Sequence, residues 1–561
     1  MTTAIHTNKK ELRKKHRRIR GRQVEQQALD DILALLGEEP LQRDLLIEYL
    51  HAIQDHYHHL SAAHLAALAE TMKLSQTEVF EVATFYHHFD IVREGEVPPP
   101  ALTVRICDSV SCELAGANKL VKNLEQMLGP DVRIQRVPCV GRCESAPVAV
   151  VGTNPVLVAS PEAVAEAVNN RHTEAKPDDY INYQRYVDQS GYQQYGKCLS
   201  GELDTESILT SLEDSQLRGL GGAGFPVGRK WRIVRDQPAP RLMAVNIDEG
   251  EPGTFKDRYY LERDPHRFLE GMLIAAEVVG IDEIYIYLRD EYAGCRKILT
   301  DELATLKSKS PHPLPSIHLR RGAGAYICGE ESAMIESIEG KRGMPRLRPP
   351  FVAEVGLFGR PTLEHNMESL YWVRDIIEKG GEWFASEGRH GRHGLRSFSV
   401  SGRVQKPGVH LAPAGITIRE LIDEYCDGML PGHEFYGYFP GGASGGIFPA
   451  SLGDIPLDFD TLNEHGGFIG SAAVIVLSDK DSAKNAAINA MRFFEHESCG
   501  QCTPCRVGTA KAVKLMEKTS WDVPLMEELS DVMMDASICG LGQAAPNPMQ
   551  CVIKYFSEEL K

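Results

Sequence analysis

Four cysteines in the C-terminal part of the chain have a spacing that can hold a metal cluster. Cys499, Cys502 and Cys505 recur at every third residue in ESCGQCTPCR, and Cys539 follows in ICGLG. A chain that returns every third residue can bring three thiolates to three irons of one 4Fe-4S cluster, while a distant cysteine binds the fourth iron. A structural zinc ion usually takes its ligands as two pairs. The spacing therefore favours a 4Fe-4S cluster, whose chemistry is electron transfer.

A second set of four cysteines is arranged as two pairs. Four residues separate Cys107 from Cys112, and three separate Cys139 from Cys143. Two pairs of thiolates suit either a 2Fe-2S cluster, with two cysteines on each iron, or a structural zinc ion, and the spacing alone leaves both open. The flanking segments VRICDS and VPCVGRCE each leave an expected strand, as in thioredoxin-like ferredoxins. These flanks favour a 2Fe-2S cluster.

The remaining five cysteines are scattered along the chain. They are Cys198, Cys295, Cys328, Cys426 and Cys551. An odd, scattered set argues against a disulfide framework and for a reducing compartment, where such cysteines are small buried apolar residues. The sequence also shows no apolar stretch of the roughly 18 residues that a membrane span requires, and no apolar core of a secretory signal. We expect a cytoplasmic protein.

Charge is distributed unevenly between the N-terminus and the rest of the chain. The first 22 residues carry nine basic side chains and one acidic one, a net charge of +8, whereas the whole chain carries −17 and the remainder therefore −25. An acidic body argues against nucleic acid as the main partner. The basic arm is interpreted as a solvated, partly disordered tail, or alternatively as a strap that binds an acidic partner subunit.

A glycine-rich segment, residues 219–224, matches the G-x-G-x-x-G string of dinucleotide-binding proteins, and Asp248 follows at a suitable distance. The match is misleading, because that fingerprint requires a preceding strand, whereas residues 207–217 have helical periodicity and Phe225-Pro226 follows directly. The glycines still allow backbone amides to approach a phosphate or a flavin ring closely. Lys230 is near enough in sequence to neutralise such a phosphate.

Two acidic loops follow apolar strands further along the chain. The first is NIDEGEPGTFKD (246–257) and the second is GAGAYICGEE (322–331). Carboxylates clustered at strand ends are typical of binding sites. They could accept hydrogen bonds from ribose hydroxyls and would repel the extra phosphate of NADP. Each loop alone could equally be a solvated surface loop, but two of them beside a glycine loop indicate a site.

The elements that position these residues cannot share one core in a chain of 561 residues. Hydrophobic periodicity predicts a multidomain protein of mixed α/β and α+β class. The predicted segments are a basic arm (1–23), a helical segment (24–98), a thioredoxin-like 2Fe-2S domain (99–170), a polar linker (171–195), an α/β domain with the glycine and acidic loops (196–394), a small ubiquitin-like α+β module (395–480) and a helical bundle with the 4Fe-4S cluster (481–561).

The motifs together resemble the NADH-binding flavoprotein subunit of respiratory complex I over about residues 200–555. They are LGGAGFPVGRKW (220–231), NIDEGEPGTFKD, GAYICGEES (324–332) and ESCGQCTPCR. Residues from about 25 to 165 resemble the thioredoxin-like 2Fe-2S subunit of the same complex. Their fusion resembles the β (diaphorase) subunits of cytoplasmic NAD-dependent formate dehydrogenases and the equivalent subunits of NAD-reducing hydrogenases. The hydrogenase form often lacks part of the first cysteine set, so the complete set favours formate dehydrogenase.

The resemblance implies that residues 196–394 bind FMN and NAD(H). The implied FMN contacts are Gly221, Gly222, Gly224, Lys230, Asn246, Asp248, Tyr326, Gly329, Glu330 and Asn366. Phe225 and Phe351 would flank the dinucleotide, with Glu251 and Glu331 on its polar groups, and Glu249 and His365 complete the cofactor-binding set. Two positions depart from the family pattern: Ile233 replaces an aromatic residue used in adenine stacking, and His365 replaces an asparagine that contacts the FMN phosphate.

The same resemblance implies the reaction and the partner. Hydride would pass between NAD(H) and FMN, and single electrons would pass through the 4Fe-4S and 2Fe-2S clusters. The expected partner is a formate-oxidising α subunit that contains molybdenum or tungsten and further iron-sulfur clusters. The alternatives are the diaphorase of an NAD-reducing hydrogenase, a complex I-like NADH dehydrogenase, and a colourless scaffold that holds zinc at both cysteine sets.

Overall fold

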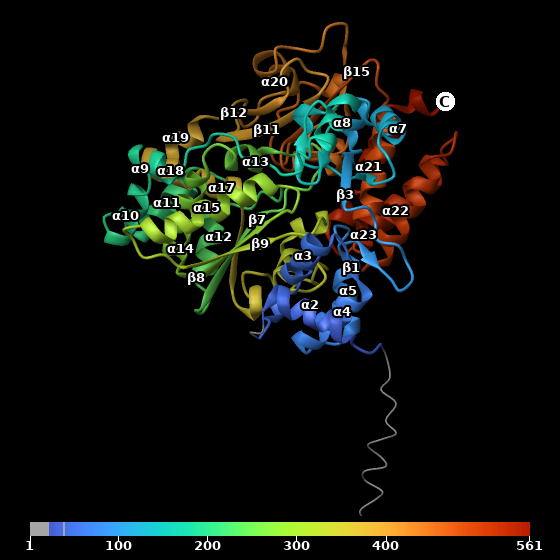
Figure 1. Ribbon diagram of the computed structural model, residues 1–561. Coiled ribbons are helices and arrows are strands. Elements are labelled where there is room, and N and C mark those ends of the chain that lie inside the picture. Colours follow the sequence, from blue (N-terminus) through green and yellow to red (C-terminus); the bar gives the residue numbers. More distant parts are fainter. Residues whose placement is uncertain (1–21, 38–39) are drawn as a thin grey trace, which may run out of the picture. The chain divides into compact units, whose positions relative to one another are not determined.

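The computed structural model describes residues 22–37 and 40–561. The chain divides into two units, Met1–Pro99 and Pro100–Lys561 (Figure 1). The predicted basic arm, residues 1–23, lies outside the described residues except for its last two positions. Within the described ranges, no helix combines the length and the apolar character that crossing a membrane requires.

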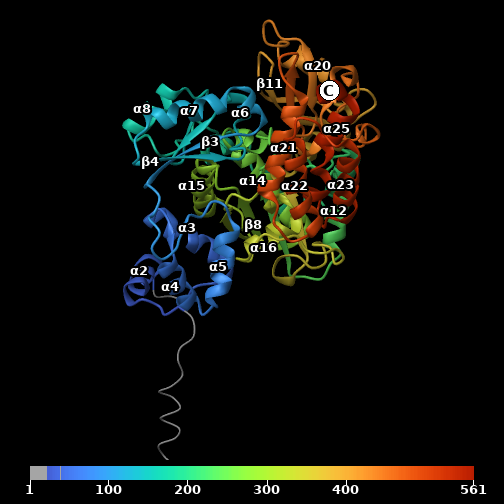
Figure 2. The same ribbon diagram turned by 90° about the vertical axis from the view of Figure 1, so that its right-hand side faces the viewer.

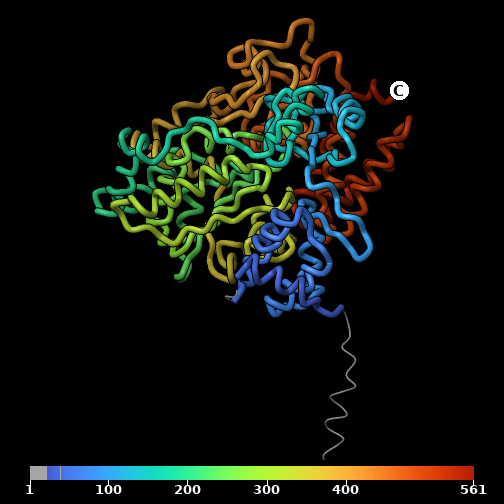
Figure 3. The backbone as a smooth tube through the Cα atoms, in the orientation of Figure 1, coloured from blue at the N-terminus to red at the C-terminus, as the bar shows by residue number. Residues whose placement is uncertain are grey.

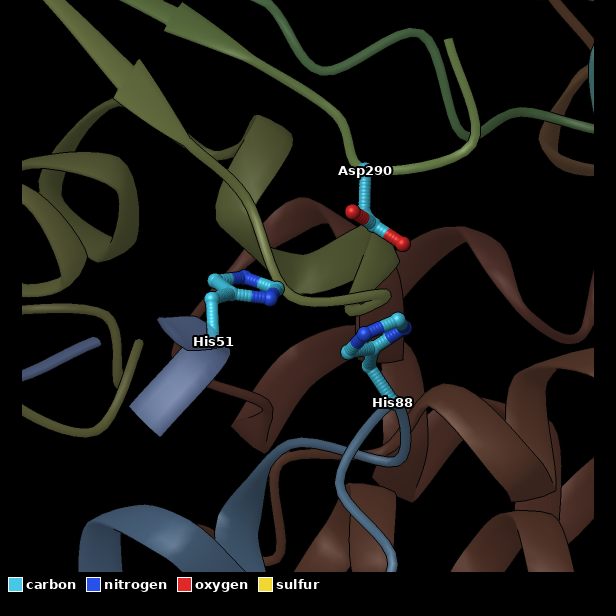
Figure 4. Close-up of side chains that lie close together, drawn as sticks. All are labelled: His51, His88 and Asp290. Carbon is cyan, nitrogen blue, oxygen red and sulfur yellow. The ribbon is translucent and has the colours of Figure 1, made fainter. Parts of the chain in front are cut away.

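The first unit is helical, in agreement with its periodicity. Ser61 and Ser75 each accept a hydrogen bond from a backbone amide three residues further on and so cap the helices that follow them. Gln54 donates to the carbonyl of His88 at 2.7 Å, and the ring of His88 lies 4.9 Å from that of His51 (Figure 4). The elements are α2 (Gln26–Leu36), η1 (Arg43–Leu45), α3 (Leu46–Tyr57), β1 (Leu60–Ser61), α4 (Ala62–Met72), α5 (Gln76–Phe85) and β2 (Ile91–Val92).

The second unit begins with a thioredoxin-like sheet in the order β4-β3-β5-β6. Strands β3 and β4 are parallel, and the other two pairings are antiparallel. Val104, Ile106, Leu120 and Leu124 lie in its core. The elements are β3 (Leu102–Cys107), α6 (Val110–Leu114), α7 (Ala117–Met127), β4 (Val132–Val137), η2 (Cys143–Ser145), β5 (Ala149–Val151), β6 (Asn154–Val156) and α8 (Pro161–Asn169).

A four-stranded parallel sheet in the order β10-β7-β8-β9 forms the centre of the second unit. Strand β7 is buried along most of its length, as expected for a parallel sheet covered on both faces. The elements are α11 (Thr205–Asp214), α12 (Val227–Arg235), β7 (Arg241–Ile247), α13 (Lys256–Leu261), α14 (Pro265–Val279), β8 (Ile281–Leu288), α15 (Ala293–Lys309), β9 (Ser316–Arg321), η3 (Tyr326–Gly329), α16 (Glu331–Ile338), η4 (Leu357–Gly359), β10 (Thr362–Asn366), α17 (Met367–Tyr371), α18 (Val373–Lys379) and α19 (Gly381–Ser386).

The structure departs from the expected linker over residues 171–195. Helix α9 (Tyr183–Asp188) and the start of α10 (Gln193–Ser200) lie within it, and their tyrosines are buried in the core of the parallel-sheet region. Buried Glu270 accepts hydrogen bonds from the Tyr186 hydroxyl at 2.6 Å and the Tyr192 amide at 2.9 Å. Tyrosine packs as an apolar ring once its hydroxyl has a partner, so a segment of polar composition can still be core.

A mixed five-stranded sheet in the order β12-β11-β15-β13-β14 forms the small α+β module. Its helix α20 begins with a capping box in which Thr417 and Glu420 satisfy each other's backbone amides. The elements are β11 (Leu395–Gly402), β12 (Gly408–Pro413), α20 (Ile418–Tyr425), β13 (Phe435–Phe439), η5 (Ala443–Gly445), β14 (Phe448–Pro449), η6 (Ala450–Leu452), η7 (Asn463–His465) and β15 (Ala473–Ser478).

The C-terminal elements form a helical bundle (Figure 2). Helix α21 packs against α22 and α25 and also contacts α6 of the thioredoxin-like part, beside which its backbone runs in Figure 3. Asn489 on α21 donates to the Asp108 carbonyl at 2.7 Å. The elements are α21 (Ala483–Glu497), α22 (Thr503–Met516), α23 (Val523–Ala536), α24 (Gly540–Ala544), α25 (Asn547–Tyr555) and η8 (Ser557–Leu560).

Candidate functional site

A cavity lies at the carboxyl edge of the parallel sheet, where loops from β7, β9 and β10 meet. Ligands in open α/β sheets bind at this edge. Ten of the residues predicted from the sequence line it: Gly221, Gly222, Asn246, Asp248, Glu249, Glu251, Tyr326, Gly329, Glu330 and Asn366. The module and the bundle complete the wall with Gly441, Ser444, Phe468, Gly470, Ser471, Gly540, Leu541 and Ala544.

The glycine loop connects two helices and is not a Rossmann turn. Helix α11 precedes it and α12 follows Pro226, as the sequence predicts. A Cβ on Gly221 would lie 2.9 Å from the Cβ of Asn366, and Gly222 has a φ of 121°, so side chains at these positions would collide or be strained. The loop backbone therefore reaches the cavity because it carries no side chains there.

Asp248 offers the cavity a polar atom that the protein leaves without a partner. Its Oδ2 is buried and, among the described residues, forms no hydrogen bond. Burial raises the pKa of this carboxyl group well above its ordinary value. Because an unpaired buried polar atom is costly, Oδ2 fits a hydrogen-bond donor on a bound ligand. Asn246 joins the two acidic loops by donating to the Gly329 carbonyl at 2.9 Å.

A buried ion-pair network supports the floor of the cavity, and the predicted residue set omitted its lysine. Lys256 is 1% exposed and pairs with Asp257 at 2.8 Å and with Glu368 at 3.0 Å. Burial alone would lower the pKa of Lys256, but the two carboxylates raise it above its ordinary value. Asn366 donates to Asp257 at 2.7 Å. The motif NIDEGEPGTFKD, which ends in these two residues, was the signal that could have identified them.

Glu251 and Tyr326 join the two acidic loops to the module and the bundle. The Tyr326 hydroxyl donates to Glu251, which also accepts a hydrogen bond from the Ser444 amide at 2.8 Å. The Tyr326 amide donates at 2.8 Å to Glu497, two residues before Cys499. The cavity wall is thus hydrogen-bonded to the segment that carries the cysteine triplet.

Glu249 lines the cavity, but its carboxylate is engaged by the protein itself. It accepts hydrogen bonds from the amides of Asp257 at 2.9 Å and Arg258 at 3.3 Å, and from the Tyr292 hydroxyl at 2.7 Å. Burial, with a further contribution from Asp257, raises the pKa of Glu249 to about 7. Its contacts make Glu249 an anchor for the start of α13.

The other six predicted residues do not line the cavity. Lys230 donates to the Glu364 carbonyl at 3.1 Å, and buried His365 accepts from the Trp231 indole at 2.7 Å, with a pKa held well below its ordinary value by burial. Arg348 pairs with Glu330 and Glu331 at 2.8 Å each. A Cβ on Gly224 would lie 2.7 Å from the Phe459 ring. The side chains with exposed apolar surface in this region include Phe225, Ile233 and Phe351.

The C-terminal cysteines converge where the bundle meets the cavity. Cys502 precedes α22, Cys505 lies in its first turn, and Cys539 precedes α24. The residues that follow Cys539, including Gly540 and Leu541, line the cavity. The thiols of Cys499, Cys502 and Cys539 all contribute to the raised pKa of Cys505, for which burial is the main cause. The arrangement places a cluster site beside the cavity wall.

The second cysteine set lies at one end of the thioredoxin-like sheet. Cys107 ends β3, Cys112 lies in α6, and the Sγ atoms of Cys139 and Cys143 are 3.3 Å apart in the loop after β4. All eight cluster cysteines are described and free of disulfides, and no three of their sulfurs lie within 4.8 Å of one another. Sulfurs around one zinc ion, each about 2.3 Å from the metal, would be about 3.8 Å apart. The wider spacing fits clusters with several irons.

Arginine side chains connect this cysteine loop to the acidic loop of the cavity. Arg289 donates to the carbonyl of Cys139 at 2.6 Å and to that of Glu249. Arg258 donates to the Gly141 carbonyl at 2.8 Å. A Cβ on Gly141 would collide with the hydroxyl and ring of Tyr292, so the two segments are packed without an intervening side chain.

Comparison with known proteins identifies the family. Residues 212–375 match the Nuo51 FMN-binding domain, residues 32–172 the thioredoxin-like [2Fe-2S] ferredoxins, and residues 485–561 the NADH-ubiquinone oxidoreductase-F iron-sulfur binding region. An NADH-quinone oxidoreductase F subunit of Rhizobium meliloti, the second of two in that organism, is 38% identical over 398 residues, which cover 68% of this chain and 94% of that protein. The chain belongs to the family of NADH-quinone oxidoreductase F subunits. The F subunit of Aquifex aeolicus is 41% identical over 399 residues, with 69% and 92% of the two chains covered.

A solved structure matches this family member over both its thioredoxin-like and flavoprotein parts. It is a chain of an NAD+-reducing [NiFe]-hydrogenase in the air-oxidized state, with a TM-score of 0.81 and 31% identity over 92% of this chain and 93% of the other. The predicted fold class is confirmed. As a member of the family the chain is an oxidoreductase that carries FMN, one 2Fe-2S cluster and one 4Fe-4S cluster and binds NADH. The open choice between zinc and iron at both cysteine sets is thereby decided for iron.

Proposed function

We propose that the chain is the diaphorase subunit of a cytoplasmic NAD-dependent formate dehydrogenase. Electrons would pass between NAD(H) in this chain and a molybdenum- or tungsten-containing subunit that oxidises formate and has iron-sulfur clusters of its own. The proposal rests on the continuity of cavity and cluster site, because the residues after Cys539 form part of the cavity wall. The complete set Cys107, Cys112, Cys139 and Cys143 supports formate dehydrogenase over hydrogenase.

In this proposal the chain's own residues bind and orient the cofactors. Bound FMN supplies the conversion between two-electron hydride chemistry and one-electron transfer. The amides of Gly221 and Gly222 face the cavity, and Asp248 Oδ2 accepts a hydrogen bond from the bound group. Hydride transfer itself requires no general acid or base, so the acidic residues serve in binding.

The dinucleotide would bind at the mouth of the same cavity. Phe225 and Phe351, which are 37% and 52% exposed, would stack against it. Glu331, beside Glu330 and Arg348, would accept hydrogen bonds from ribose hydroxyls. An acidic rim repels the additional phosphate of NADP, which supports a preference for NAD.

The second candidate is the diaphorase of an NAD-reducing hydrogenase. It is favoured by the match to the hydrogenase chain, which extends over both the thioredoxin-like and the flavoprotein parts. In this alternative the residues of this chain have the same roles, and only the electron donor on the partner differs.

The test is to purify the complex anaerobically with its partner subunits and to measure NAD+ reduction with formate and with H2 in parallel. Electron paramagnetic resonance before and after NADH addition monitors both clusters. Formate-dependent turnover with cluster signals supports the proposal. Turnover with H2 alone assigns the chain to a hydrogenase, and cluster signals with neither donor would refute both partner assignments.

A further inference from the structure

A second cavity of about 290 Å³ lies behind the glycine loop, between that loop and the α+β module. Leu217, Arg218 and Leu220 from the loop side, and Arg392, Arg396 and Phe459 from the module side, line it. None of these residues belongs to the cavity of the proposed cofactor site. The second cavity shares the glycine loop with that site, because the Arg218 guanidinium donates to the Gly224 carbonyl at 2.5 Å.

Arg396 presents an unsatisfied donor in this cavity. The residue is 3% exposed, and among the described residues its Nε has no hydrogen-bond partner. Its Nη2 donates to Asp458 at 2.9 Å, and its guanidinium lies 4.1 Å from the centre of the Phe459 ring. Burial lowers the pKa of Arg396, although Asp458 opposes that effect. A buried guanidinium with a free donor is a costly arrangement unless a further acceptor binds.

The lining carries more positive than negative charge. Arg218, Arg392 and Arg396 line the cavity, and among its described lining residues Asp458 is the sole carboxylate. Each of its oxygens already accepts from a different arginine, Arg392 at 2.7 Å and Arg396 at 2.9 Å. Arg218 pairs at 2.7 Å with Asp460, outside the lining. The two carboxylates leave one positive charge uncompensated.

We propose that this cavity binds a small oxyanion, of the phosphate or carboxylate class. Guanidinium groups bind such anions through paired, charge-assisted hydrogen bonds. The volume is ample for one anion and a few waters, each of which occupies about 30 Å³. The anion accepts from Arg396 Nε and from the arginines at the rim, and it thereby holds Arg218 and the glycine loop in place.

The experiment titrates FMN-loaded, anaerobic holoenzyme with inorganic phosphate and, separately, with acetate, at constant ionic strength and with saturating NAD+. Thermal unfolding midpoints report binding, and hydrogen exchange of residues 216–225 and 391–396 locates it. We expect a saturable rise in midpoint with at least one anion, together with slower exchange in both segments. The two arms distinguish a tetrahedral from a planar oxyanion.

Arg392→Gln should weaken the apparent affinity about tenfold, because it removes one charge-assisted donor. The matched control is Arg389→Gln, whose side chain has the same 31% exposure and pairs with Glu424 instead of lining the cavity. Its affinity should equal that of the unaltered protein. The proposal fails if neither anion binds saturably, if both variants respond alike, or if exchange slows only around the cofactor cavity. The hydrogen-exchange measurement on unaltered protein decides the matter should Arg392→Gln fold poorly.

Discussion

Neighbouring carboxyl groups in the first acidic loop have different tasks. Asp248 keeps one buried oxygen without a protein partner, whereas Glu249 uses both oxygens to hold the start of α13 and Tyr292. Both are raised in pKa by burial, Glu249 to about 7. The hydrogen-bond partners, not the residue type, separate a ligand-binding acid from a structural one.

At the residue scale we predict that Glu249 makes stability fall as pH rises. Its pKa is about 7 in the folded protein and 4.5 ordinarily, so between these values only the folded state retains the proton. Stability then decreases with pH in that window, by up to about 1.4 kcal/mol per unit. Glu249→Gln should remove this slope in thermal midpoints measured anaerobically from pH 5 to 7. Exposed Glu166→Gln is the control, and an unchanged slope in Glu249→Gln would contradict the prediction.

At the scale of elements, the loop after β4 is attached to the parallel sheet by side chains that follow β8. Arg289 connects the carbonyls of Cys139 and Glu249, and it is 4% exposed. The packing of Tyr292 against Gly141 excludes a side chain at that glycine. One rigid connection therefore orients both the 2Fe-2S cysteine loop and the acidic loop of the cofactor cavity.

We predict that Arg289→Gln perturbs the 2Fe-2S cluster selectively. The substitution removes the positive charge and leaves two buried carbonyls without their donor, each worth about 1–3 kcal/mol. The paramagnetic resonance signal of the reduced 2Fe-2S cluster should shift or weaken while the 4Fe-4S signal remains. Arg296→Gln, which affects a partly exposed arginine on α15, is the control. A change confined to the 4Fe-4S signal would refute this role.

At the scale of the whole molecule, the two clusters differ in their relation to the cofactor cavity. The C-terminal set adjoins it through α24, which contributes Gly540, Leu541 and Ala544 to the wall. The thioredoxin-like set reaches it only through the arginine connection described above. We infer that electrons leave the cavity mainly through the 4Fe-4S cluster.

This inference predicts different outcomes for two cysteine substitutions. Cys505→Ala should abolish the 4Fe-4S signal and donor-dependent NAD+ reduction, but preserve NADH oxidation by an artificial acceptor that reacts at the flavin. Cys112→Ala should abolish the 2Fe-2S signal and retain most donor-dependent NAD+ reduction. Both activities and both signals are measured on the same anaerobic preparations. Loss of donor-dependent reduction in Cys112→Ala with its 4Fe-4S signal intact would overturn the assignment.

The sequence by itself determined the cluster ligands and most of the cavity lining. Cluster chemistry requires cysteines at short, regular spacing, and the glycine and acidic motifs are equally local, so both can be recognised without coordinates. The helix before the glycine loop was also predictable, because periodicity over residues 207–217 is a local property.

Only the tertiary structure decided which side chains face the cavity and which are used elsewhere. Glu249 anchors α13, and His365 binds Trp231, 134 residues away in the chain. The tyrosines of the expected linker became core because Glu270, about 80 residues further on, accepts their hydrogen bonds. The physical reason is common to all three: burial and hydrogen-bond partners come from residues distant in sequence, which local patterns do not encode.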